Sequence, residues 1–506
     1  MKEYLMGIDI GTTACKVAVF DSKGKLCASA SDQYPVYYPE EGYAEQDPEE
    51  WWMAVSNSIK CCMEEAKLKP SEIAGIGIDG QSWSAIAVDK KGEVLTRTPI
   101  WMDTRAAEIC MELNNEIGKD AITKLCGNPL AATYSTGKVL WYKKYIPDVY
   151  KRIDKILQSN SFIAFKLTGV YSQDVSQGYA FHFFDNKNGK WNADMCKTMG
   201  LPVNFFPEIS PCDKVIGTVN REAAARCGLM EGIPVVAGGL DAAAGALGVG
   251  VIHEKETQEF GGTSCGFSIC MDSYRYDSRL VLSTHVVPGK WLLQGSSNAG
   301  GNVMRWLEME LGEYERLIGA DMGKSTLEMY NDLAHKIPVG SDGLVFLPYM
   351  NGERSPIWDA NAKGVYFGLD YNKTRGHLIR SAMEGVAFAE RHSLDVAENA
   401  GAVVEEIRAT GGSTNSYLWT QMKADILRKT VTVPDVREAT AFGAALLAGV
   451  GVGMYASYDE ALHNKVKIAR THKTNEDDAW RYEKNYKIYR RLYECLKDLM
   501  KEAALK

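Results

Sequence analysis

The stretch "DIGTTACKVAVFD" at residues 9–21 decides the fold, because a similar stretch, "FGGTSCGFSICMD", occupies residues 260–272. Each copy predicts a strand, a Gly-Thr-Thr or Gly-Thr-Ser turn, and a second strand. A match of this length can arise by chance. However, one copy lies near the start of the chain and the other near its middle, which favours duplication of a whole domain. The alignment pairs Gly11 with Gly262, Thr12 with Thr263, Thr13 with Ser264 and Asp21 with Asp272.

Strands and helices alternate around the first copy, and this alternation predicts an α/β fold. The 506 residues are too many for one ordinary core, so we expect two large lobes, 1–249 and 250–506, with the boundary near Gly250. The helix should begin at Pro48 after the N-cap residue Asp47. The expected elements are strands at 4–10, 15–20, 25–33 and 73–80, a helix over 48–67 and a hairpin over 84–95.

Composition excludes several classes of protein. Hydrophobic residues make up 45% and charged residues 24%, as in globular proteins, and the formal net charge of -8 argues against a nucleic-acid binder. No stretch is long and apolar enough for a membrane span, and the N-terminal sequence lacks the pattern of a signal peptide. The 12 cysteines form no CxxC pair. These features predict a cytoplasmic protein with reduced thiols and no nucleic-acid or membrane partner.

The two Gly-Thr turns are candidate phosphate sites. A glycine turn presents backbone N–H groups and hydroxyls to an anion, and Lys16 follows the first turn closely enough to reach a phosphate. The alternative is that the segment is an ordinary β-hairpin turn. The presence of a second copy argues against this alternative. The first copy opens with Asp9 where the second has Phe260. A carboxylate beside phosphates is repulsive unless a cation lies between them, so the sequence predicts Mg²⁺ near Asp9.

Three further segments carry candidate chemistry or packing. In "GGLDAAAGALGVG" (238–250), Asp241 is either an acidic turn residue or a working acid with space cleared around it. In "ATGGSTNSYLWTQMKADIL" (409–427), a glycine turn between strand and helix fits a nucleotide base or ribose, or is a plain tight turn. The small residues of "REATAFGAALLAGVGVG" (437–453) suit a helix packed closely on another helix or buried in the core.

Two segments resemble familiar nucleotide-binding motifs but lack the spacing or the neighbouring elements that those motifs require. "GIGIDG" (75–80) is formally GxGxxG, but its glycines lie within the expected strand and no helix follows. "GADMGKST" (319–326) has three residues between its glycines where a P-loop needs four. Neither segment therefore supports a classical dinucleotide or P-loop site.

Taken together, the segments resemble the FGGY family of carbohydrate kinases, in order and over nearly the whole chain. The first hairpin resembles its first phosphate motif, "FGGTS" its second, "GGSTNS" its adenosine motif, and "EATAFGAALLA" and "GERSPIWDANAKGVYFGL" (352–369) are typical of it. The resemblance implies a two-lobed actin-like ATPase (ribonuclease H-like) fold, a duplicated domain whose central mixed sheet is flanked by helices. Within the family, "EQDPEEWW" (45–52) and "FLPYMNGERSP" (346–356) are most similar to xylulokinases.

The resemblance also implies site residues and the cofactors ATP and Mg²⁺. Asp241 would be the catalytic base, and Asp9 and Asp241 the metal ligands. Trp83 could instead be a core aromatic, and Asp103 and Arg105 a structural ion pair. The implied ATP-binding residues are Gly11, Thr12, Thr13, Lys16, Gly262, Thr263, Ser264, Gly301, Gly411, Gly412, Ser413 and Asn415. The implied sugar-binding residues are Gln81, Ser82, Trp83, Trp101, Asp103, Arg105, Asp241 and Ala242.

The sugar pocket departs from the xylulokinase pattern. Xylulokinases usually have Gln-Met-His-Gly where this chain has "QSWS" at 81–84, and Asn where it has Ala242. The expected function is ATP-dependent phosphorylation of a small carbohydrate, with D-xylulose the first choice among ketopentoses. D-ribulose, L-xylulose, gluconate and polyols remain alternatives, as do a non-catalytic nucleotide switch and a sugar sensor. The sequence leaves the oligomeric state open, with a homodimer as one option.

Overall fold

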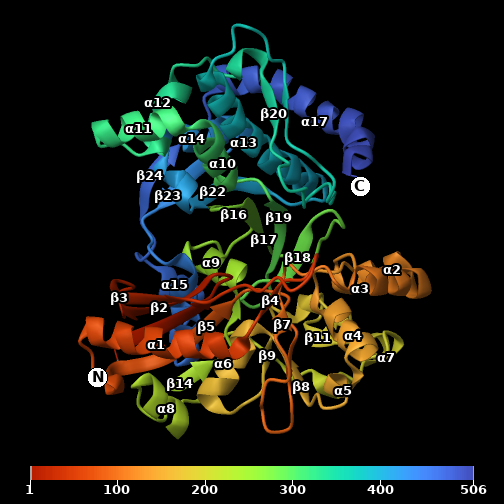
Figure 1. The fold of residues 1–506 in the computed structure, drawn as a ribbon. Helices are drawn as coiled ribbons and strands as arrows, with labels where there is room; N and C mark the ends of the chain where they lie inside the picture. Colours follow the sequence, from red (N-terminus) through yellow and green to blue (C-terminus); the bar gives the residue numbers. More distant parts are fainter. Residues whose placement is uncertain (1–2, 505–506) are drawn as a thin grey trace.

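The computed structural model describes residues 3–504 as two lobes, each built on a seven-stranded mixed sheet (Figure 1). The first sheet has the order β13-β14-β5-β1-β2-β3, and β15 also pairs with β5. The second has the order β18-β19-β17-β16-β22-β23-β24. The strands of the first sheet are β13 (Val215–Thr218), β14 (Pro234–Val236), β5 (Ile73–Gly80), β1 (Tyr4–Ile10), β2 (Ala14–Asp21), β3 (Leu26–Gln33) and β15 (Gly239–Leu240). Those of the second are β18 (Val281–Thr284), β19 (Trp291–Ser297), β17 (Cys265–Met271), β16 (Lys255–Gly261), β22 (Val404–Thr410), β23 (Thr430–Pro434) and β24 (Ile468–His472).

Strand pairing confirms the duplication. The central strand β1 is antiparallel to β2 and parallel to β5, and β16 is likewise antiparallel to β17 and parallel to β22. The hairpins close at Ile10 opposite Cys15 in the first lobe and at Gly261 opposite Cys265 in the second. The first turn is therefore one residue longer than the second. The expected α/β class and the mixed sheets flanked by helices are both present.

Helices cover the sheets of both lobes (Figure 1). In the first lobe α1, α6 and α8 lie together on one face, and α9 and α15 pack on the other. The first lobe has α1 (Pro48–Ala66), α2 (Ala107–Leu113), α3 (Lys119–Cys126), α4 (Ser135–Tyr145), α5 (Pro147–Tyr150), α6 (Ser159–Thr168), α7 (Ala193–Thr198), α8 (Arg221–Cys227) and α9 (Asp241–Gly248). The second half of the chain adds α10 (Gly301–Leu311), α11 (Glu313–Met322), α12 (Thr326–His335), α13 (Arg375–Asn399), α14 (Tyr417–Leu427), α15 (Ala439–Gly451), α16 (Tyr458–Leu462) and α17 (Glu476–Ala504).

Most elements expected from the sequence form where they were predicted. The helix α1 begins at Pro48, and the Asp47 side chain caps it by accepting from the backbone N–H of Glu49 at 2.9 Å. The hairpin expected over 84–95 is only partly correct. Its first arm forms β6 (Ile86–Val88), which pairs with β8 (Lys155–Leu157), while its second arm makes a single bridge between Val88 and Val94. The local turn is still present, because Asp89 N donates to Glu93 O at 3.0 Å and Leu95 N donates to Ala87 O at 2.9 Å.

Helix α15 comes from the second half of the sequence but packs on the first lobe, against β1, β5 and α9 (Figure 1). Glycines make this approach possible. A Cβ atom added to Gly7 of β1 or Gly77 of β5 would lie 1.7 or 1.8 Å from a carbonyl oxygen of α15. One added to Gly443 of α15 would lie 1.9 Å from the Ala244 oxygen of α9. A single division of the chain at residue 250 therefore does not separate the two lobes.

Among residues 3–504, no helix is both long enough and apolar enough to cross a membrane.

The α9–α15 contact predicts a large cost for one added methyl group. Gly443→Ala should lower the free energy of unfolding by about 3 kcal/mol, because backbone atoms of α9 must move to admit the new Cβ. Urea unfolding measures this. The control is Gly323→Ala, whose Cβ meets nothing but whose φ of +66° is costly for alanine. That control should lose only about 1 kcal/mol. Equal losses in the two variants would contradict close packing at Gly443.

Candidate active site

Two carboxylates meet at the ends of β1 and β5. Asp9 is the register partner of Asp79 in the parallel pair, and its Oδ2 accepts from Thr440 Oγ1 at 2.7 Å. Burial raises the pKa of Asp9, and Thr440 and Lys16 oppose that rise. Burial and the charges of Asp9 and Asp241 raise the pKa of Asp79 well above its usual range. Both side-chain oxygens of Asp79 are buried and have no hydrogen-bond partner among residues 3–504.

Asp241 is the first residue of α9. Its Oδ1 accepts from the backbone N–H of Ala242 at 2.6 Å. Burial, with a contribution from the negative charge of Asp9, raises the pKa of Asp241 to about 7. A carboxyl group with a pKa near neutral is suited to accept a proton during a reaction.

A cavity of about 370 Å³ lies between the lobes, and Asp9 and Asp241 both line it. The first lobe contributes Asp9, Gly11, Thr12, Gln81, Ser82, Trp83, Trp101, Tyr179, Leu240, Asp241, Ala242 and Gly245. The second half of the chain contributes Gln258, Phe260, Ser264, Val281, Gln294, Ser296, Arg354 and Thr440. Most of the sugar-side residues expected from the sequence thus share one cavity with the expected base and the first phosphate turn.

The first turn is held from several sides. Gly11 N donates to Ala14 O at 3.1 Å, and Tyr34 Oη donates to Gly11 O at 2.6 Å. The indole Nε1 of Trp101 donates to Thr12 Oγ1 at 2.9 Å, so a residue of the cavity wall positions a hydroxyl of the first Gly-Thr turn. Thr13 lies in the same turn, outside the cavity lining.

Lys16 does not line the cavity. Its Nζ pairs with Glu438 Oε2 at 2.5 Å, just before the start of α15. The ammonium expected to reach a phosphate is thus engaged by the second half of the chain.

The second turn is tied to the start of α10. Gly301 N donates to Gly262 O at 2.8 Å, and Asn302 N donates to Thr263 O at 3.0 Å. Ser264 of this turn lines the cavity. Gly262, Thr263, Ser264 and Gly301 therefore form one compact unit at the end of β16.

The expected adenosine residues lie beside that unit. Gly411 has a φ of +85°, and its added Cβ would lie 2.7 Å from the oxygen of Gly261 at the end of β16. Gly412, Ser413 and Asn415 follow in a short 3₁₀ turn. Beneath the turn, the buried Lys423 pairs with Glu259 at 2.5 Å and Glu390 at 3.1 Å, and its Nζ lies 3.4 Å from Ser413 Oγ. These residues flank the second phosphate turn rather than the cavity itself.

The sugar-side wall has unsatisfied polar atoms. Trp83 has a left-handed φ of +65°, and its ring centre lies 4.2 Å from that of Tyr134. Ser82 Oγ and Tyr179 Oη lie 3.0 Å apart. Within residues 3–504, Trp83 Nε1 and Gln81 Oε1 are buried and have no hydrogen-bond partner. A buried donor and a buried acceptor at one wall match the hydroxyl groups of a small polyol.

Asp103 and Arg105, expected on the sugar side, do not line the cavity. Asp103 is fully buried and accepts from the Ala44 N–H at 2.8 Å and from the Arg105 guanidinium at 2.7 Å. Arg105 also pairs with Glu45 at 2.7 Å and lies over the ring of Tyr43. This arrangement corresponds to the structural ion pair that was the alternative for these residues, because each charge is already satisfied by the protein.

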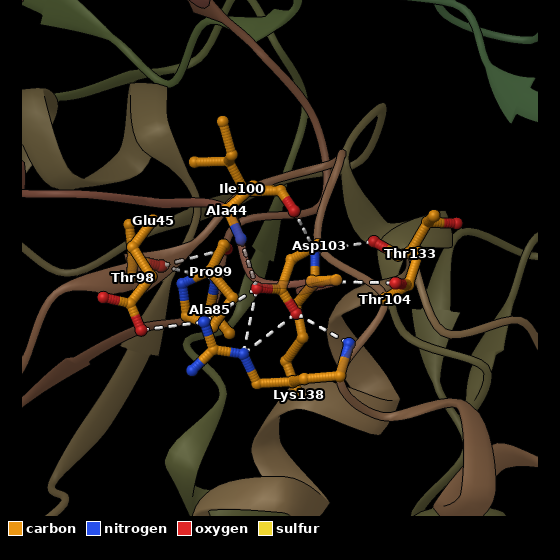
Figure 2. A network of polar contacts seen from close by, with 12 residues as sticks. Ala44, Glu45, Ala85, Thr98, Pro99, Ile100, Asp103, Thr104, Thr133 and Lys138 are labelled. Atoms are coloured by element: carbon orange, nitrogen blue, oxygen red, sulfur yellow. Dashed lines mark hydrogen bonds and ion pairs between the residues drawn. The ribbon is translucent and has the colours of Figure 1, made fainter. Parts of the chain in front are cut away.

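Lys138 belongs to the same buried network (Figure 2). Its ammonium donates to the carbonyl oxygens of Trp83, Ile100 and Thr133 at 2.7, 2.7 and 2.6 Å. Trp83 and Trp101, which follows Ile100, line the cavity, and the ring of Tyr134, which follows Thr133, packs at a tilt against Trp83. The Lys138 ammonium therefore holds together the three segments that carry Trp83, Trp101 and Tyr134.

Sequence reasoning missed Asp79, which lies beside Asp9 but does not line the cavity, and several residues that do line it. Asp79 could have been found from its position, because it ends a strand parallel to the one that ends at Asp9. Thr440 was missed because its segment was interpreted only as a helix rich in small residues. Arg354 was missed because its segment was quoted as typical of the family without a role for any residue. Phe260 was noted only as the counterpart of Asp9 in the repeat. Nothing local marks Gln258, Gln294 or Ser296, which the strands β16 and β19 of the second sheet bring to the cavity.

Two duplicated lobes with a Gly-Thr hairpin at the end of each central strand define the class of actin-like ATPase folds. Residues 4–248 match the N-terminal domain, and residues 260–452 the C-terminal domain, of the FGGY family of carbohydrate kinases. The chain belongs to this family, whose members use ATP as phosphate donor and a small-molecule sugar as acceptor.

Individual relatives cover the whole length. The chain is 29% identical over 502 residues to a xylulose kinase of Staphylococcus epidermidis, covering 99% of this chain and 98% of that protein. It is 28% identical over 500 residues to a gluconokinase of Bacillus licheniformis, covering 98% and 97%. The crystal structure of ligand-bound xylulose kinase from Lactobacillus acidophilus matches with a TM-score of 0.91 at 26% identity, covering 99% of this chain and all of that one.

The Lys138 network predicts a stability cost for loss of one ammonium. Lys138→Met keeps the length of the side chain but leaves three buried carbonyl oxygens without their donor. It should lower the free energy of unfolding by about 3 kcal/mol in urea titrations. Lys144→Met, an exposed lysine on the same helix with 45% of its side chain accessible, is the control and should change little. A Lys138→Met protein as stable as the wild type would show that the ammonium does not hold these loops.

Proposed function

We propose that the chain transfers the γ-phosphoryl group of ATP to a hydroxyl of a ketopentose, with D-xylulose the first candidate. One observation carries the proposal: Asp241 lines one cavity together with Gly11 and Thr12 of the first Gly-Thr turn and with Gln81, Ser82 and Trp83. A base, a phosphate-binding turn and a polyol-binding wall thus face the same space.

In the proposed reaction, Asp241 accepts the proton of the attacking sugar hydroxyl. The hydroxyl oxygen forms a bond to the γ-phosphorus, and the bond between that phosphorus and the β–γ bridging oxygen breaks, so that its electron pair leaves with ADP. Such transfers depend mainly on positioning and on stabilisation of charge. The first turn, with Thr12 held by Trp101, orients the phosphate end of the donor.

The residues near Asp9 fit a magnesium ion. Asp9 and Asp241 are oxygen ligands whose pKa values are raised by burial, and Lys16 is already paired with Glu438. Among residues 3–504, no group of three or more His, Cys, Asp or Glu is arranged to hold a metal. Mg²⁺ would therefore be held by Asp9, with Asp241 nearby, and would complete its shell with water and phosphate oxygens. When bound, it would neutralise phosphate charge.

The acceptor sugar is the open choice. The xylulose kinase relatives support a ketopentose, the gluconokinase relatives support an aldonate, and Trp83 and Ala242 depart from the usual xylulokinase residues. Coupled ADP release should be measured with D-xylulose, D-ribulose, L-xylulose, gluconate and small polyols. Stimulation by one of them names the substrate. No stimulation by any would contradict the proposal and favour a nucleotide switch or a sugar sensor. A homodimeric state and a cytoplasmic location remain predictions.

Replacement of the base tests the mechanism. Asp241→Asn should reduce turnover by about 10²- to 10⁴-fold, because the amide cannot accept the proton. Thermal unfolding and ATP binding by calorimetry should stay close to those of the wild type. Near-normal turnover in this variant would refute the assignment of Asp241 as the base.

The raised pKa of Asp241 predicts a pH profile. The base works only when ionised, so kcat/KM should fall about tenfold per pH unit below a pKa near 7 and level off above it. Initial rates between pH 5.5 and 8.5 measure the profile. The residual activity of Asp241→Asn should lack this acid limb. A limb that persists unchanged in the variant would belong to another group.

A further inference from the structure

Arg354 is half-buried, and among residues 3–504 no carboxylate forms an ion pair with its guanidinium. Arg354 lines the cavity from the second lobe, in the loop that follows β20 (Val345–Leu347). Its one side-chain hydrogen bond runs from Nη2 to the carbonyl oxygen of Ser297 at 3.3 Å. Its Nε is buried and has no partner, and no ion pair involves it in the described part of the chain, residues 3–504.

The adjacent Glu353 does not fill that role. Its carboxylate accepts from Ser297 Oγ at 2.5 Å and from the backbone N–H groups of Asn298 and Arg354 at 2.7 Å each. Ser355 N also donates to Ser296 O at 3.0 Å. These bonds tie the loop to the end of β19 and fix the backbone of residue 354. None of them engages the guanidinium of Arg354.

The guanidinium faces the first lobe across the cavity. Its Cζ lies 5.4 Å from the ring centre of Trp101, within the range of a cation–π contact. Trp101 in turn donates to Thr12 of the first phosphate turn. Burial lowers the pKa of Arg354, although guanidinium stays charged in proteins. The charge therefore lies beside the phosphate turn, in a cavity that also holds Asp9 and Asp241.

A guanidinium that is partly removed from water and has no counter-ion is costly, and a bound oxyanion offsets that cost through paired N–H donors. Asp9 and Asp241 repel an anion, so an anionic ligand needs a cation on its other side. We propose that Arg354 binds an oxyanion in the cavity, either the transferred phosphoryl group or the carboxylate of an acidic sugar. This inference rests on the proposed function, because it takes the cavity to be the reaction site.

The two possible oxyanions, a phosphoryl group and a sugar carboxylate, predict changes in different kinetic constants of the Arg354 variants. Arg354→Gln removes the charge, Arg354→Lys keeps it without the planar fork, and Arg279→Gln, on an exposed arginine paired with Asp277, is the control. If Arg354 binds the phosphoryl group, Arg354→Gln should lower kcat about 100-fold for every accepted sugar, with the KM for that sugar unchanged. If it binds a carboxylate, the KM for gluconate should rise about 100-fold and that for a neutral ketopentose should not. Arg354→Lys should recover part of either loss.

Binding measurements keep the test independent of turnover. Calorimetric titrations with gluconate and with a non-hydrolysable ATP analogue should show a loss of at least tenfold in affinity for one of them in Arg354→Gln, at wild-type thermal stability. Kinetic and binding constants all within threefold of the wild type would overturn the proposal. A wild-type chain that phosphorylates no sugar in the panel would instead refute the proposed function, and the titrations would still decide on Arg354.

Discussion

The close approach of helix backbones at the base of the cleft is the constraint on which the site depends. Helix α15 contacts β1, β5 and α9 at distances that exclude a Cβ atom at the contact points. The start of α9 carries Asp241, the start of α15 carries Thr440, and β1 ends at Asp9 and Ile10. Because these backbones cannot separate without losing their packing, the three polar groups are held together before any ligand arrives.

Charge in the cleft is distributed unevenly between the lobes. The first lobe contributes Asp9 and Asp241, and burial raises the pKa of both. The second contributes Arg354, whose charge burial also disfavours. Charged groups this poorly compensated are expensive in a folded protein and are kept where ligands complete them. We therefore expect that substrates complete the charge balance of this cavity, which has two carboxylates from the first lobe and one guanidinium from the second.

The repeat and the family motifs predicted the fold class and the two hairpins, and they singled out Asp241. Each of these signals lies within a short run of adjacent residues. Other features depend on contacts between distant segments. Lys16 meets Glu438 of the second half, and Asp103 accepts hydrogen bonds from Arg105 and Ala44, so both side chains already have partners within the protein. A local pattern shows that a residue is polar and near a motif. It does not show which donors the rest of the chain has already supplied.

The position of α15 also affects the order in which the protein can fold as it is made. The strands of the first sheet all lie within the first 240 residues, but the helix that covers one of its faces ends at Gly451 of 506. During synthesis from the N-terminus, the part of that face that α15 covers stays exposed until most of the second lobe has left the ribosome. The first lobe is thus completed late, by a segment delivered from the other one, and the two lobes mature together rather than in sequence.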